Sequence, residues 1–195
     1  MKRMRFLGAA LAAIVVAGGG SLAVADPWGN QSGTTGAHPD EDPHTYCFAG
    51  NVPADLRPNI DNAAFNALDP TQANVNFQGS CVLSGASETD AVFQNVNLAP
   101  GVTGVTPCDD YESNPPTNQC DQYDVQLDYA QINVGAEDEI DQTQTACHEL
   151  GHSVGLSHGA NLGCMISTGD TPPTALRYRR YDPNHHIPDH INPWF

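Results

Sequence analysis

The chain has 195 residues and a formal net charge of −16, from 23 acidic and 7 basic side chains. A field of that sign repels phosphate backbones and anionic lipid headgroups, which argues against nucleic acid and membrane surfaces as partners. The acids favour solubility outside the cell, and calcium binding stays open as an alternative, with the acidic runs at 40–42 and 137–139 as candidates.

The first 25 residues have the pattern of a signal peptide. Basic residues at positions 2, 3 and 5 precede an apolar run over 6–16 and the small-residue sequence Ala-Val-Ala at 23–25. The apolar run is too short to span a bilayer. We therefore expect a secreted, extracellular protein that starts near Asp26 and folds as one domain over 26–195.

The next part of the chain predicts a loose arm, a strand, a helix and two further strands. Residues 26–43 are rich in Gly, Pro, Asn, Thr and acids, which indicates a flexible N-terminal arm. A strand is expected over 45–52. Apolar residues spaced along one helical face predict a helix over 59–68. Alternating apolar and polar residues predict strands over 73–77 and 91–98.

The second half contains the longest predicted loop, the clearest strand and the clearest helix. The loop is expected over 107–120, where Gly, Pro, Ser and Asn accumulate. A strand is predicted over 124–134 from the alternation of Val125, Leu127, Tyr129 and Ile132. A helix is predicted over 141–156, with Asp138 or Asp141 as its N-cap and acids in its first turn.

Residues 148–158 read HELGHSVGLSH, which fills every fixed position of the pattern H-E-x-x-H-x-x-G-x-x-H. Histidines four residues apart share one face of a helix, so His148 and His152 can bind the same ion. Glu149 lies beside the first ligand, where a carboxylate can accept a proton from the attacking water.

The third histidine of the pattern requires the chain to reverse direction. His158 lies ten residues after His148, which is about 15 Å along a continuous helix. Gly155 tolerates a positive φ and can end the helix so that His158 swings back to the metal. Three protein ligands leave a fourth position open, which is typical of catalytic zinc.

This extended motif resembles that of the metzincin metallopeptidases, and Met165 follows His158 by seven residues, a spacing similar to that of the matrixins. The resemblance is strong over 141–167. It implies an α+β, zincin-like metzincin fold: a twisted mixed sheet, a long active-site helix and a small irregular C-terminal subdomain. It implies further that Met165 lies beneath the histidines without binding the metal, and that the strand over 124–134 pairs its free edge with an extended peptide.

Departures from the family pattern leave the residue that stabilises the reaction intermediate open. Ser167 stands where the astacin-like branch has a tyrosine. Tyr178 or Tyr181 could line the specificity pocket or assist the oxyanion, and packing is the alternative for both. The matrixin thiol-switch motif is absent from the sequence, and the snapalysin-like proteases carry an aspartate where this chain has His158. A second cluster near the C-terminus can be solvated or can bind a second metal; its members are His185, His186 and His190.

Six cysteines in an exported chain favour three disulfides, with fifteen possible pairings. Cys147 directly precedes His148, and Cys164 directly precedes Met165. We predict a bridge between these two cysteines that fastens the zinc helix to the methionine turn. The other predicted pairs are Cys108 with Cys120 and Cys47 with Cys81.

The predicted function is that of a secreted zinc endopeptidase. His148, His152 and His158 hold one zinc ion, and Glu149 acts as general base. The expected partner is a polypeptide substrate, and the expected state is a monomer. Two alternatives stay open: an inactive extracellular zinc-binding module, which the retained Glu149 disfavours, and a metallohydrolase that acts on a non-peptide amide.

Overall fold

The computed structural model describes residues 38–39, 43–85, 87–111, 119–158, 163–165, 179–181, 183, 187 and 191–195. The predicted signal peptide and several residues singled out above lie outside the described residues: Ser167, Tyr178, His185, His186 and His190. None of the helices in these ranges is long and apolar enough to cross a membrane.

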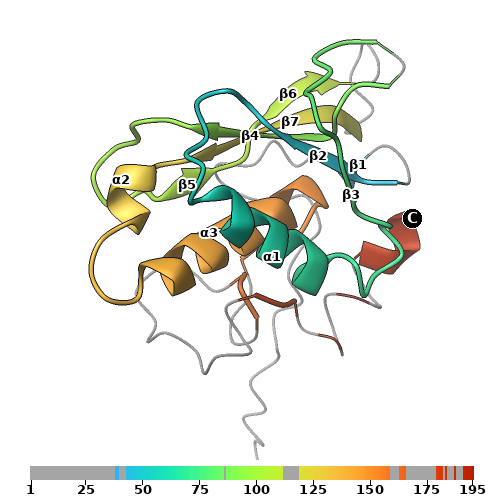
Figure 1. Cartoon of the computed structure of the whole chain (residues 1–195). Helices are drawn as coiled ribbons and strands as arrows, with labels where there is room; N and C mark the ends of the chain where they lie inside the picture. The colour runs from blue at the N-terminus through green and yellow to red at the C-terminus, as the bar shows by residue number, and fades with distance from the viewer. Residues whose placement is uncertain are drawn as a thin grey trace, which may run out of the picture.

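The described residues form a mixed sheet with two helices packed side by side on one of its faces (Figure 1). The strands are β1 (His38–Pro39), β2 (Thr45–Phe48), β3 (Asn76–Phe77), β4 (Ala91–Asn95), β5 (Gly104–Val105), β6 (Cys108–Tyr111) and β7 (Gln119–Leu127). The helices are α1 (Arg57–Ala67), α2 (Tyr129–Ile132) and α3 (Asp138–Ser153), followed by a 3-10 turn, η2 (Asn192–Trp194). The predicted α+β class is therefore correct.

The first helix forms where the apolar spacing predicts it. α1 begins two residues before the predicted range, with a proline in its first turn, and its buried side chains are Ile60, Ala63, Ala64 and Ala67. The three small alanine side chains allow close packing against α3. Between the two helices Asn59 donates a hydrogen bond from Nδ2 to Oε1 of Gln142 at 2.7 Å.

The active-site helix of the prediction is present as α3, shifted by about one turn. It covers Asp138–Ser153 rather than 141–156. The predicted capping is wrong, because the N-cap residue is Glu137 and makes no side-chain cap bond. Asp138 and Asp141 instead lie in the first turn, where the helix dipole favours negative charge.

The strand predicted over 124–134 is wrong at both ends. β7 begins five residues earlier and ends at Leu127. Asp128 ends the strand, because its carboxylate accepts a hydrogen bond from the backbone N–H of Gln131 at 3.3 Å and caps α2. The last two members of the predicted apolar set therefore belong to a helical turn.

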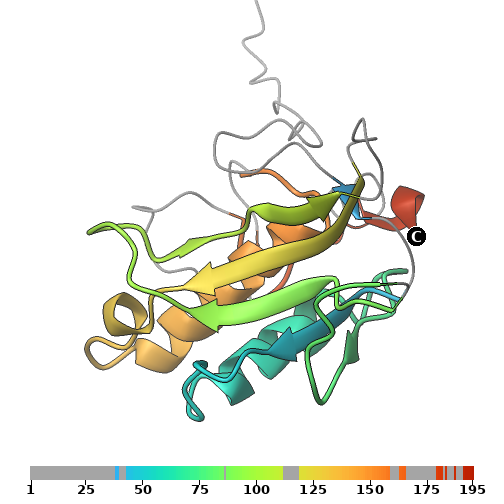
Figure 2. The ribbon, with the colours of Figure 1, turned by 90° about the horizontal axis from the view of Figure 1, so that it is seen from above.

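β7 also lacks the free edge expected of it. Tyr123 pairs with Ala91 of β4 and with Cys108 of β6, while Gln126 and Leu127 pair with both β4 and β5. Figure 2 shows β5 and β6 on one side of β7 and β4 on the other. Among the described strands β5 pairs with β7 alone. Among the described strands, the one next to α3 that offers an outer edge is therefore β5.

The remaining differences concern short strands. The strands predicted over 45–52, 73–77 and 91–98 are present but shorter, as β2, β3 and β4. The predicted loop over 107–120 contains β6 and the start of β7, and β1 lies inside the predicted arm over 26–43. Strand ends depend on pairing with distant partners, and a local pattern does not contain that information.

Candidate metal centre

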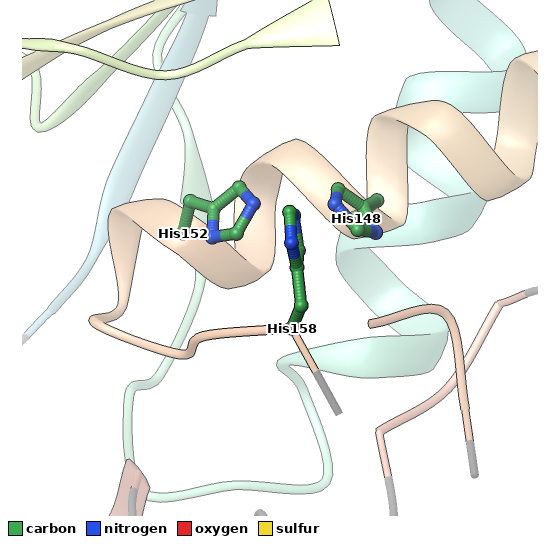
Figure 3. Close-up of side chains that lie close together, drawn as sticks. All are labelled: His148, His152 and His158. Carbon is green, nitrogen blue, oxygen red and sulfur yellow. The ribbon is translucent and has the colours of Figure 1, made fainter. Parts of the chain in front are cut away.

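Three histidine side chains come together beside α3 (Figure 3). His148 and His152 project from the helix and His158 from the segment after it, with one possible ligand nitrogen from each within 4.8 Å of the others. Within the described residues this is the one group of three or more histidine, cysteine or acidic side chains with such geometry. These are the three predicted histidines, and they could hold a metal ion.

Gly155 ends the helix and reverses the chain toward the histidines. Its φ is +83°, a left-handed value that favours glycine. Gly155 donates its N–H to the carbonyl of His152 at 3.0 Å, and Leu156 donates its N–H to the carbonyl of Gly151 at 2.8 Å. These two bonds form a Schellman motif. The predicted role of Gly155 as the turning point is confirmed.

Backbone carbonyls orient the two helical histidines. Nδ1 of His148 lies 2.8 Å from the carbonyl oxygen of Cys164, and Nδ1 of His152 lies 2.7 Å from that of Leu156. A carbonyl oxygen only accepts, so each Nδ1 must carry the proton and each Nε2 keeps a free lone pair. Both rings are thus fixed in the tautomer that binds a metal through Nε2.

Burial favours the neutral form of these two rings. It lowers the pKa of His148 to about 4 and that of His152 to about 3, although the carbonyl contacts act in the opposite direction. Neutral imidazole is the form of histidine that binds metals. The donor set therefore fits a divalent ion that prefers nitrogen ligands.

Glu149 lies on the same turn of α3 but outside the histidine group. Thr106, in the segment between β5 and β6, donates a hydrogen bond from Oγ1 to Oε2 of Glu149 at 2.7 Å. Burial raises the pKa of Glu149 to about 7, and the bond from Thr106 partly offsets this shift. A carboxyl group with a pKa near neutrality can both accept and return a proton. Thr106 could not be identified from the sequence, because no local pattern connects residues 43 positions apart.

Met165 is fully buried against α3. A Cβ atom placed on Gly151 would lie 2.2 Å from the Met165 sulfur, so the thioether occupies the space that a larger residue would fill. A glycine in the interior of a helix normally destabilises it by about 1 kcal/mol. Gly151 inside the predicted helix is therefore a sequence signal for this close approach, and it was missing from the expected site residues.

Tyr181 supports the methionine turn and does not line a pocket. Its side chain is buried, and its hydroxyl donates to the carbonyl of Cys147 at 3.0 Å. The neighbouring Arg180 carbonyl accepts the N–H of Cys164 at 2.9 Å. The suggestion that Tyr181 assists the oxyanion is therefore wrong, and packing is its role.

The three disulfides join the pairs predicted from the sequence, and the chain has no free cysteine. The Cys147–Cys164 bridge has a Cα–Cα separation of 5.9 Å and links α3 to the methionine turn. Cys164 also provides the carbonyl that orients His148. The bridge therefore restrains a contact to the metal site as well as the fold.

Removal of this bridge is expected to weaken both folding and metal binding. Replacing Cys147 and Cys164 by alanine opens a loop closed across 17 positions, which the chain-entropy model values at about 3 kcal/mol. Loss of the fixed carbonyl should also lower the affinity for a divalent metal ion by roughly 10–100-fold, as for other partners of metal ligands. Denaturant unfolding and competition with a chromogenic chelator measure the two effects.

The Cys47–Cys81 bridge is the matched control. It spans 34 positions and joins β2 to the loop before β4. Its removal should cost at least as much stability and leave the affinity for a divalent metal ion unchanged. Equal losses of metal affinity in the two variants would contradict a specific role for Cys147–Cys164.

The site thus combines three imidazole donors with a buried carboxyl group on the helix that carries two of them. Such a group can hold an electrophilic metal ion and move a proton next to it. No protein-family model matches the sequence, and no curated protein matches it at a significant level.

Proposed function

We propose that this protein is a zinc-dependent endopeptidase of the metzincin type. The observation that carries the proposal is the convergence of His148, His152 and His158 beside a helix that also presents Glu149. The resemblance of residues 148–158 to the extended metzincin motif, with Met165 packed against the same helix, supports it.

Zinc is the metal that best suits the donor set. Three histidines and no cysteine or carboxylate in the group are typical of catalytic zinc sites, which keep a further position for water or substrate. Calcium and magnesium prefer oxygen ligands. We therefore propose that the three histidines hold one zinc ion.

The proposed chemistry is hydrolysis of a peptide bond. When bound, zinc would polarise the scissile carbonyl and lower the pKa of a water molecule. Glu149 accepts the proton of the attacking water on its carboxylate and then returns it to the leaving amine. The Nδ1 contacts of His148 and His152 hold the two rings in place during this exchange.

The proposed substrate is an extended polypeptide that pairs with the outer edge of β5. β5 lies against α3. The contact is so close that a Cβ atom placed on Gly104 would come within 2.5 Å of the Glu149 side chain. A chain added antiparallel or parallel to this strand would pass next to the general base. An added strand can extend beyond β5 at both ends. We therefore propose that the substrate is cleaved internally and not at its termini.

We further propose that the protein acts outside the cell. Three disulfides and no free cysteine among its six are typical of an oxidising compartment. The signal-peptide pattern of the first 25 residues supports secretion.

Casein zymography tests the function. The purified protein should clear casein, lose the clearing zone in the presence of a strong chelator, and regain it after zinc is added. An inactive zinc-binding module would bind zinc without clearing casein, and a hydrolase of other amides would cleave small amide substrates only. Clearing that survives the chelator would contradict a metal-dependent mechanism.

A further inference from the structure

The side chain of Glu149 is held on two sides by the segment that contains β5. Glu149 is 5% exposed and Thr106 is 1% exposed, so neither group exchanges freely with water. The Thr106 hydroxyl lies 2.7 Å from Oε2 of Glu149 and 3.1 Å from its backbone carbonyl. A hydroxyl has one proton to donate, and the carboxylate is the stronger acceptor of the two.

Gly104 makes the second contact. An ideal Cβ on this residue would lie 2.5 Å from Oε1, 2.6 Å from Cγ and 2.7 Å from Cδ of Glu149. The carboxylate therefore lies across the space that any other residue would fill. Gly104 is not among the glycines with positive φ, so its backbone does not require glycine. Glycine is therefore needed at position 104 only because any larger side chain would collide with Glu149.

We propose that Gly104 and Thr106 form a carboxylate seat that positions the general base, and that they are positioning residues for the reaction. Thr106 holds one carboxylate oxygen by a hydrogen bond, and Gly104 leaves room for the other. A role for these two residues in catalysis rests on the proposed function. The seat itself is a property of the fold and can be tested without any assay of activity.

The seat also connects the base to the substrate edge. Gly104 pairs with Leu127 through β5, and the bond from Thr106 to Glu149 lies one residue beyond that strand. A polypeptide paired with the outer edge of β5 would restrain the same short segment that holds Glu149. Binding of an extended substrate would then reduce the motion of the base, whereas a small amide would not.

A comparison of thermal stability in two backgrounds tests the seat. Gly104→Ala in the otherwise unchanged protein should lower the Tm by roughly 3–8 °C, because the added methyl group displaces the Glu149 carboxylate. In the Glu149→Ala background the same change should leave the Tm unchanged or raise it, because the methyl group then fills vacated space. Equal Tm changes in both backgrounds would overturn the proposal.

Gly50→Ala is the matched control. Gly50 also lacks a positive φ, and a Cβ on it would have no neighbour within 4 Å. It should change the Tm little, and equally in both backgrounds. If Gly104→Ala prevents folding, Thr106→Val gives the same comparison: it should lower the Tm where the carboxylate is present and have a smaller effect where Glu149 is alanine.

Kinetic measurements on Thr106 variants test whether the Thr106 hydroxyl positions Glu149 for the reaction. Thr106→Val should lower kcat by about 10–100-fold, with KM and zinc content nearly unchanged, since the misplaced base is still present. Thr106→Ser keeps the hydroxyl and should restore most of kcat. Equal kcat values for the valine and serine variants would show that the hydroxyl does not position the base. If the parent protein cleaves no peptide, the proposed function fails, while the Tm comparison still decides whether the seat exists.

Discussion

Glu149→Ala is expected to keep the zinc content near one ion per chain. The rate of peptide cleavage should fall by about 10²–10⁴-fold, the usual contribution of a general base. Glu149 is not among the residues whose ligand atoms converge, so its loss should leave the metal in place. Its carboxylate is buried with a pKa of about 7, which suits proton transfer near neutral pH. Elemental analysis and kcat/KM on a fluorogenic peptide measure the two effects.

Glu139→Ala is the control for this variant. Glu139 lies on the same helix, in its first turn, and is exposed to solvent. The Glu139→Ala substitution removes one negative charge from α3 without contacting the site. Both zinc content and kcat/KM should therefore stay close to those of the parent protein. Full activity of Glu149→Ala would contradict the proposed mechanism.

His152→Ala is expected to lose zinc and activity together. His152 is 6% exposed, and its Nδ1 already donates to the Leu156 carbonyl, so its Nε2 is fixed for the metal. Removal of a direct ligand should reduce zinc affinity by more than about a hundredfold, beyond the 10–100-fold that loss of an outer partner costs. Zinc retained after dialysis and residual peptide cleavage are the two measurements.

His44 provides a matched control for the loss of a buried histidine. It is fully buried, and its Nε2 lies 2.9 Å from Oγ of Ser153 at the end of α3, outside the histidine group. His44→Ala should lower stability but retain zinc. Zinc retained equally by the two variants would show that His152 is not a ligand.

The local part of the site could be predicted from the sequence. The distance from His148 to His152 follows from the helix period, and the reversal at Gly155 follows from the tolerance of glycine for positive φ. The pairing of Cys147 with Cys164 followed from their positions beside a ligand and beside Met165. The first two inferences involve residues that a single helix or turn brings together, and the third joins two segments only 17 positions apart.

The parts that were missed depend on contacts between distant segments. β5 has two residues and no recognisable pattern, and it exists because it pairs with β7. Thr106 lies near Glu149 only because that pairing places the end of β5 over α3. The error over 124–134 had a different cause: the apolar alternation continued past Asp128, but the capping bond of that residue begins a helical turn instead.

Cys164 would couple metal binding by the three histidines to the oxidation state of the chain. Its sulfur is bonded to Cys147, and its carbonyl orients His148. If the oxidised chain binds zinc more tightly, thermodynamic reciprocity requires that zinc favour the oxidised chain by the same factor. Reducing surroundings would then hold the protein in a form with low metal affinity. Oxidation of the Cys147–Cys164 pair would thus come before tight metal binding.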